Sequence, residues 1–203
     1  MASTESKDPS PSTTSTPPTR RAYKGSCHCG KTQYITYLTL PPPTISATDT
    51  TTTRFRKCNC STCHKTAFFH VRVPHEPEDF LLLAPRNPFA DLADYTCFES
   101  RIHWFFCGTC GVRCFAFSGE GEEREVDVEG EKRMVWSAKR EGWVKGTSAK
   151  GFDYLTVNGV TIEPGQEGFD MREWMEKGWI AYLDVKDEVG EPRLRRPYDG
   201  GAY

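Results

Sequence analysis

Apolar residues in this chain come in short runs that alternate with polar positions, which is the pattern of β-strands rather than of helices. Several of these runs end at a proline, at a tight-turn pair or at a cysteine motif. The predicted strands cover residues 32–40, 67–73, 80–84, 102–106, 112–117, 153–160 and 179–183. The strands at 102–106 and 112–117 flank a pair of cysteines, which predicts a hairpin with a metal at its turn.

One short helix is predicted near the C-terminal end. Asp170 followed by Glu173 resembles a capping box, with Asp in place of Ser or Thr, and Gly178 is a typical stop signal. These signals predict a helix over 171–177. Its inward side chains are expected to be Met171, Trp174 and Met175. The chain as a whole is therefore expected to be mainly β, with this one brief helix.

The 203 residues are enough for one domain with a hydrophobic core. Residues 1–19 are almost all Ser, Thr, Pro and small polar residues, which predicts a disordered tail. We expect the folded domain to span 20–185 and residues 186–203 to form an exposed C-terminal tail. A Pro/Thr stretch at 41–53 and a charged Gly/Glu stretch at 119–133 are predicted as loops.

Localisation and charge set limits on the partners. No apolar run approaches the roughly 18 residues of a membrane span, and no signal-peptide stretch is evident, so we expect a soluble cytoplasmic protein with no membrane partner.

The net charge of -2 is unevenly distributed. Residues 20–73 carry nine Lys or Arg against Asp49, whereas residues 74–134 carry thirteen Asp or Glu against six basic residues. The basic stretch either attracts an anionic small molecule or nucleic acid, or is scattered over a solvated face.

Seven of the nine cysteines lie in three closely spaced motifs. The motifs are GSCHCG with Cys27 and Cys29, CNCSTC with Cys58, Cys60 and Cys63, and FCGTCG with Cys107 and Cys110. In an extended segment residues i and i+2 face the same way, so both sulfurs of a C-x-C can reach one ion. A C-x-x-C around a tight turn also brings two sulfurs together, and Gly108 and Gly111 would relieve the backbone there.

These spacings predict two metal sites of different kinds. Structural zinc takes four tetrahedral ligands, and two cysteine pairs supply four. The predicted closed site consists of Cys27, Cys29, Cys107 and Cys110. The other motif supplies three ligands and leaves a fourth position vacant, as in a catalytic zinc site. This predicted open site consists of Cys58, Cys60 and Cys63. We therefore expect two Zn²⁺ ions per chain.

Alternatives remain open at this point. His64 could serve as a fourth ligand and close the second site. A C-x-x-C alone could be a redox dithiol, although disulfides rarely persist in a reducing cytosol. His28, placed on a strand between two ligands, would point away from the metal. Residues expected to be ordinary core, strand or loop positions are Cys97, Cys114, His70, His75 and His103.

The order of the motifs GSCHCGK, CNCSTCHK and FFCGTCGVRCF resembles that of the glutathione-dependent formaldehyde-activating family, which also includes centromere protein V. The similarity runs from Tyr23 to Phe117, with a weaker likeness near 153–183. It implies a β-tent fold of small antiparallel sheets around zinc sites. It also implies that the four-cysteine set holds a structural zinc and that Cys58, Cys60 and Cys63 form the catalytic-type site. The segments at 41–53 and 119–133 look like elaborations of the family pattern.

The activity that this resemblance implies is a carbon–sulfur lyase reaction, in which glutathione and formaldehyde condense to S-hydroxymethylglutathione. Glutathione or a glutathione adduct would then be the substrate. A zinc ion with three thiolates suits the exchange of an incoming thiol, whose pKa it would lower. Arg56, Lys57 and Lys65 could attract the carboxylates of glutathione, and His64 could shuttle a proton.

A second hypothesis is a zinc-stabilised β module that binds nucleic acid or protein without catalysis. The basic stretch at 20–73 favours it. The slightly negative net charge and the lack of a Lys/Arg-rich segment make nucleic acid an unlikely partner. A third hypothesis is a purely structural role in which both zinc sites are closed.

Overall fold

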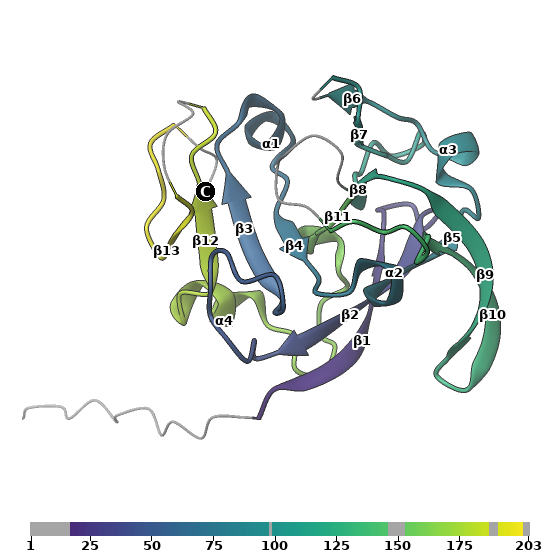
Figure 1. Ribbon diagram of the computed structural model, residues 1–203, viewed down its shortest axis with the longest axis horizontal. Coiled ribbons are helices and arrows are strands. Elements are labelled where there is room, and N and C mark those ends of the chain that lie inside the picture. Colours follow the sequence, from purple (N-terminus) through teal and green to yellow (C-terminus); the bar gives the residue numbers. More distant parts are fainter. Residues whose placement is uncertain (1–16, 98, 146–152, 187–190, 201–203) are drawn as a thin grey trace, which may run out of the picture.

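The computed structural model describes residues 17–97, 99–145, 153–186 and 191–200, which form two β-sheets with short helices between the strands (Figure 1). The predicted tail at 1–19 lies mostly outside these residues, and Thr19 already belongs to the first strand. The expectation of a mainly β fold with small sheets is confirmed. Within the described residues, no helix is both long enough and apolar enough to cross a membrane.

The first sheet is antiparallel and has the strand order β1-β2-β5-β10-β9. Its strands are β1 (Thr19–Ser26), β2 (Gln33–Leu40), β5 (Phe80–Ala84), β10 (Glu131–Ala138) and β9 (Gly121–Val128). Strands β2 and β5 were predicted from their apolar runs. They carry Leu38, Phe80 and Leu82 into the main core, where all three side chains are fully buried.

The second sheet has the strand order β13-β12-β3-β4-β11-β8-β7-β6. Its strands are β13 (Arg193–Leu194), β12 (Ile180–Leu183), β3 (Arg54–Cys58), β4 (His70–Arg72), β11 (Tyr154–Asn158), β8 (Phe115–Ser118), β7 (Ile102–His103) and β6 (Thr96–Cys97). Neighbouring strands are antiparallel except β12 and β3, which run parallel. The predicted hairpin around the third cysteine motif is present, because β7 pairs with β8 at His103 and Phe117.

Four α-helices and one 3-10 turn lie among the described residues, rather than the one helix that was predicted. They are α1 (Ser61–Thr66), α2 (Glu76–Asp79), α3 (Pro88–Asp91), α4 (Met171–Glu176) and η1 (Gly159–Thr161). Helix α4 is the predicted one, and the side chain of Asp170 accepts a hydrogen bond from the backbone N–H of Arg172 at its start. Trp174 is fully buried as expected, whereas the prediction for Met175 is wrong: it is 68% exposed. Six residues make fewer than two turns, so only a narrow stripe of α4 faces the core.

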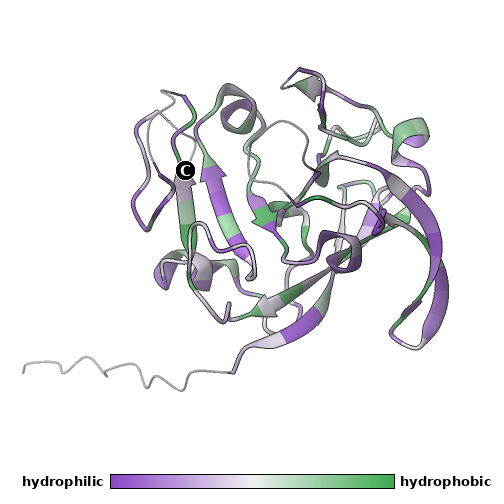
Figure 2. Cartoon of the chain, viewed as in Figure 1, coloured by the Kyte–Doolittle hydropathy of each residue, from purple (hydrophilic) through white to green (hydrophobic). Residues whose placement is uncertain are grey.

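The predicted loop at 119–133 is wrong, because this segment forms most of the β9–β10 hairpin. Glu129 and Gly130 connect the two strands with positive φ angles of 54° and 86°, as a two-residue hairpin turn requires. The hairpin is mostly hydrophilic and lies on the side of the molecule opposite β13 (Figures 1 and 2). Val128 and Val135 are nevertheless buried, in a small second core with Ile35 and Leu81. Because valines alternate with charged residues along this segment, it forms a strand with one apolar face.

Part of the predicted exposed tail at 186–203 also belongs to the sheet. Strand β13 pairs with β12 at Ala181 and Tyr182. The guanidinium of Arg193 lies 3.6 Å from the ring centre of Tyr198, and the hydroxyl of Tyr198 donates a hydrogen bond to the carbonyl of Glu191. The described part of this segment therefore folds back on the domain.

The second sheet has two chemically different faces. On one face Phe55, Val71 and Val157 join the main core, where Phe55 stacks on Trp174 with ring centres 4.1 Å apart. Side chains alternate along a strand, so the neighbouring positions point to the opposite face. The side chains on that opposite face line one cavity, and they belong to Arg56, Cys58, His70, Arg72, Tyr154 and Ser118.

Candidate functional site

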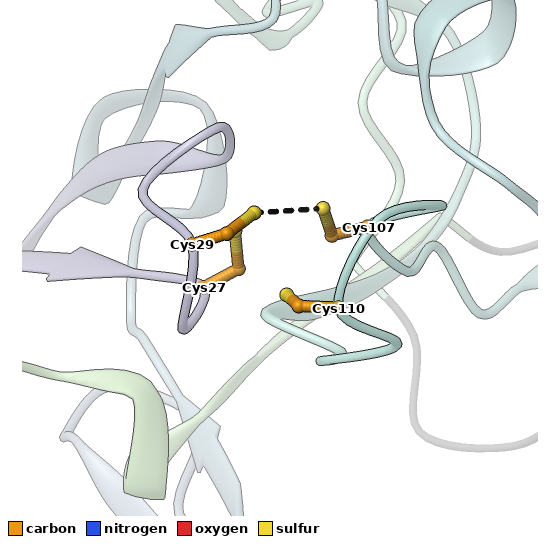
Figure 3. Close-up of side chains that lie close together, drawn as sticks. All are labelled: Cys27, Cys29, Cys107 and Cys110. Atoms are coloured by element: carbon orange, nitrogen blue, oxygen red, sulfur yellow. Dashed lines mark hydrogen bonds between the residues drawn. The ribbon is translucent and has the colours of Figure 1, made fainter.

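Four of the cysteines converge where the β1–β2 connection meets the β7–β8 connection (Figure 3). The sulfur atoms of Cys27 and Cys29 are 3.6 Å apart, and those of Cys29 and Cys107 are 3.5 Å apart. All four sulfurs, including that of Cys110, lie within 4.8 Å of one another. The described cysteines are free thiols, since a disulfide requires sulfurs about 2 Å apart.

The two loops of this site have matching backbones. The N–H of Cys27 donates to the carbonyl of Thr32, and the N–H of Cys107 donates to the carbonyl of Val112, each five residues later. Gly30 and Gly111 follow the second cysteine of each loop, with φ angles of 76° and 75°. The prediction that the first C-x-C is extended is wrong, because β1 ends at Ser26 and the cysteines lie in a turn. His28 is exposed on that turn.

The four sulfurs match the spacing that a tetrahedral metal needs. With zinc–sulfur bonds of about 2.3 Å, tetrahedral ligands are about 3.8 Å apart. Backbone N–H groups already point at these sulfurs, such as that of Thr32, whose nitrogen lies 3.2 Å from the Cys27 sulfur. Burial opposes ionisation of Cys107, but the N–H groups of Cys110 and Thr109 lower its pKa to about 6. The group could therefore hold a metal ion as a closed set of four thiolates.

The second group, Cys58, Cys60 and Cys63, is built by the junction of β3 and α1. Cys58 is the last residue of β3, and Cys60 is the N-cap of α1, with its sulfur accepting a hydrogen bond from the N–H of Cys63. The N–H of Cys60 in turn points at the sulfur of Cys58, at 3.4 Å. The three sulfurs lie within 4.8 Å of one another. Local backbone geometry alone therefore assembles this group.

Asn59 separates the first two of these cysteines and points to the other side of the chain. Its side-chain oxygen accepts hydrogen bonds from the N–H groups of Val185 and Lys186, and its amide nitrogen lies 2.6 Å from a carboxylate oxygen of Asp184. The alternation predicted for an extended C-x-C holds here. Asn59 anchors the motif to the end of β12, so Cys58 and Cys60 can both face the cavity.

A cavity of about 240 Å³ opens directly beside the three-cysteine group. Its apolar walls include Ile102, Trp104 and Leu183. Its charged walls are the guanidinium groups of Arg56, Arg72 and Arg101. Within the described part of the chain, the Nε atoms of Arg56 and Arg72 lack a hydrogen-bond partner, although Arg72 is only 3% exposed and also contacts Glu76 at 3.4 Å. Buried N–H donors without partners are rare, and here they line a space that an anion could enter.

Electrostatics also favour a cation at the three sulfurs. The neighbouring thiols of Cys58 and Cys60, followed by burial, raise the pKa of the Cys63 thiol. Three thiolates this close repel one another unless a positive ion lies between them. Thiolate sulfurs in such an arrangement are ligands for a soft or borderline metal ion. The two clusters together could hold two metal ions per chain, as the spacing predicts.

Comparisons with known proteins add little to this geometry. No protein-family model matches the chain, and no curated protein matches it. Among solved structures, the chain resembles the crystal structure of a Rhodobacter sphaeroides protein, a target of the Northeast Structural Genomics effort. The TM-score is 0.40 and the sequence identity is 18%, over 71% of this chain and 91% of that chain.

The structure separates the predicted site residues into those that meet and those that do not. All seven motif cysteines lie in the two groups that their spacing predicts. His64 is exposed on α1 and belongs to neither group, so it is not the fourth ligand. Of the predicted cations, only Arg56 lines the cavity. Lys57 lies instead over the ring of Phe69, at 5.1 Å, and Lys65 is exposed.

Sequence reasoning missed His70 and Arg72 as site residues. Both fall in the strand predicted over 67–73, where His70 is expected to be an ordinary strand or loop histidine. One signal could have found them: in the sequence FHVRV, His and Arg occupy alternate positions between apolar residues, immediately after a cysteine motif. In a strand, that pattern puts both polar side chains on one face. The same alternation in β3 places Arg56 beside Cys58.

Proposed function

We propose that the chain binds zinc at both cysteine groups and uses the three-cysteine site for carbon–sulfur chemistry between glutathione and an aldehyde such as formaldehyde. The observation that carries the proposal is the contrast between the two sites. The four-cysteine group is a complete ligand set, whereas the three-cysteine group lies in the wall of a cavity that also presents the buried Arg72 and the half-buried Arg56. The resemblance of the motifs to the glutathione-dependent formaldehyde-activating family supports the same reaction.

Zinc bound by Cys58, Cys60 and Cys63 would supply a fourth position at which a thiol loses its proton at neutral pH. The chain provides the rest of the site. Arg56 and Arg72 offer guanidinium N–H groups to a carboxylate of the thiol, and Trp104 excludes water beside the sulfurs. In the reaction the thiol sulfur forms a bond to the carbonyl carbon, the carbonyl double bond becomes a single bond, and the proton ends on the oxygen. The product is a hemithioacetal, and the reverse step releases the aldehyde.

A turnover assay tests this proposal. Zinc-loaded protein is mixed with glutathione and formaldehyde, and S-hydroxymethylglutathione is followed by NMR against the uncatalysed rate. Cys60→Ser should reduce turnover to the uncatalysed rate. The matched control is Cys97→Ser, because Cys97 is outside the sulfur group and a serine oxygen can still accept the hydrogen bond from Trp104. A wild-type rate equal to the uncatalysed rate, or full activity of Cys60→Ser, would contradict the proposal.

The arginines make a separate prediction about substrate choice. Arg56→Ala should raise KM for glutathione about 10- to 100-fold, since a hydrogen bond to a charged group contributes about 1.5–3 kcal/mol. The kcat should change little, because the carboxylate is remote from the reacting sulfur. The comparison substrate is 2-mercaptoethanol, which has no carboxylate and should react equally with both proteins. An equal loss for both thiols would mean that Arg56 does not recognise a carboxylate.

The basic stretch at 20–73, which motivates the hypothesis of a nucleic-acid-binding module, does not form one exposed face. Arg54 and Arg72 are buried, with 2% and 3% exposure, and Arg56 faces the cavity. Arg20 lies 2.6 Å from a carboxylate oxygen of Asp79. Much of this positive charge is therefore directed into the molecule, which favours a small anionic ligand. A salt-sensitive shift of DNA mobility would support the binding module instead.

A further inference from the structure

His70 contacts a cysteine of the open site from the neighbouring strand. It lies in β4, which pairs with β3 on one side and with β11 on the other. Its Nε2 atom is 3.0 Å from the sulfur of Cys63. Its Nδ1 atom is 3.2 Å from the hydroxyl oxygen of Thr156 and 3.4 Å from that of Tyr154. Both ring nitrogens of this buried side chain therefore have polar partners.

We propose that His70 is a positioning residue for the three-cysteine site: its Nε2–H donates a hydrogen bond to the Cys63 thiolate, holds that sulfur as a ligand and leaves the fourth metal position free. This inference rests on metal binding at that site, as in the proposed function. The resemblance by motif does not include His70, which lies outside all three cysteine motifs.

The geometry argues against His70 as the fourth ligand. In a tetrahedral site with bonds of about 2.3 Å to sulfur and 2.0 Å to nitrogen, the nitrogen is about 3.5 Å from each sulfur. The ring nitrogens of His70 do not come within 4.8 Å of all three sulfurs, although one of them is close to Cys63. The ring therefore approaches the cluster from the side of Cys63 only, so it contacts a ligand and leaves the remaining position to the cavity.

The direction of the hydrogen bond follows from the chemistry of a metal ligand. A cysteine bound to a metal is a thiolate, which can only accept a hydrogen bond. The proton must then be on Nε2, and Nδ1 is the acceptor, with the hydroxyls of Thr156 and Tyr154 as the two donors within reach. A neutral imidazole carries one N–H, and Nε2 is the ring nitrogen that faces the Cys63 sulfur.

Aromatic packing fixes the ring in this orientation. The ring centre of Phe68 is 4.8 Å from that of His70, and Trp104 packs edge-on with ring centres 6.0 Å apart. A rigid N–H donor favours the thiolate form of Cys63 and holds its sulfur in place as a ligand, and it also stabilises the sulfur lone pairs, which raises the energy of sulfur-to-metal charge transfer. Such outer contacts typically change metal affinity 10–100-fold.

Cobalt substitution tests the proposal without relying on turnover. The full-length protein is reconstituted with Co²⁺, and the spectrum of Cys60→Ser is subtracted to remove the four-cysteine site. His70→Phe should move the sulfur-to-cobalt charge-transfer band to longer wavelength and weaken Co²⁺ binding about tenfold. His70→Gln should stay close to wild type, because its amide nitrogen can occupy the place of Nε2. The control is His75→Gln, an exposed histidine outside the cavity.

The outcomes separate this inference from the proposed function. If wild type and Cys60→Ser give the same spectrum, the three-cysteine site holds no metal, and both proposals fail. If metal binds but the band stays in place in His70→Phe, only the role of His70 is overturned. The same holds if His70→Gln shifts the band as far as His70→Phe. Thermal unfolding of each variant establishes that it is folded, and the glutamine variant provides the test if the phenylalanine variant is not.

Discussion

Removing one thiolate from each site should have unequal effects on stability. Cys29→Ser and Cys60→Ser form the pair of variants. Cys29 is the exposed member of the closed group, so its substitution removes a ligand without disturbing core packing. Each variant should hold one zinc ion where wild type holds two.

The magnitudes follow from the length of chain that each metal closes. The sulfurs of Cys29 and Cys107 are 78 residues apart in sequence, so a bound metal acts as a crosslink across a long loop. By the chain-entropy relation for crosslinks, a loop of this length contributes about 4.5 kcal/mol, whereas the short loop from Cys58 to Cys63 contributes about 2 kcal/mol. For a chain of this size 1 kcal/mol shifts Tm by about 2–4 °C. We expect Tm to fall by about 9–18 °C in Cys29→Ser and by about 4–8 °C in Cys60→Ser.

Thermal unfolding followed by circular dichroism measures both falls in Tm. Elemental mass spectrometry measures the number of zinc ions per chain. In wild-type protein treated with a chelator, Tm should fall at least as far as it does in Cys29→Ser. The reasoning is refuted if Cys60→Ser destabilises the protein as much as Cys29→Ser, or if Cys29→Ser keeps both its metal content and its Tm.

Three further predictions concern the scaffold. Trp174→Ala should lower the free energy of unfolding by about 3–5 kcal/mol, because the side chain is fully buried and stacks on Phe55; urea unfolding measures this, and a loss below 1 kcal/mol would contradict it. Gly111→Ala should cost about 1–2 kcal/mol through its φ of 75° alone, since an added Cβ meets no atom within 4 Å, whereas Gly108→Ala should be nearly neutral in the same assay. Asn59→Ala should cost about 1–3 kcal/mol in denaturant titration, because two backbone N–H groups lose their acceptor.

The charged hairpin shows where reading composition misled the prediction. Residues 119–133 look like a loop because ten of them are acidic or basic and three are glycines, and loops favour such residues. The period-2 pattern of Val126 and Val128 among those charges was the better signal. Whether that apolar face finds a partner depends on β2 and β5, which supply Ile35 and Leu81 from far earlier in the chain.

The two histidines near the open site illustrate the same limit. His64 was the candidate ligand because it follows Cys63 directly, yet the α1 helix turns it to the solvent. The sequence predicts His70 as an ordinary strand residue, yet pairing of β3 with β4 brings its ring to the sulfur of Cys63. Adjacency in sequence does not decide which side chain meets a metal site, because backbone conformation sets the direction of each side chain.

The sequence by itself determined the mainly β class and the three local cysteine motifs, two pairs and one triplet. Both depend on short-range geometry, since a two- or three-residue spacing decides which neighbouring sulfurs can meet and a period of two decides which side chains share a face. Only the tertiary structure brought together the two cysteine pairs, which are 78 residues apart, and decided what surrounds the open site. Strand pairing places Arg56, His70 and Tyr154 around one cavity, and such pairing depends on contacts between segments that are distant in sequence, which no local pattern contains.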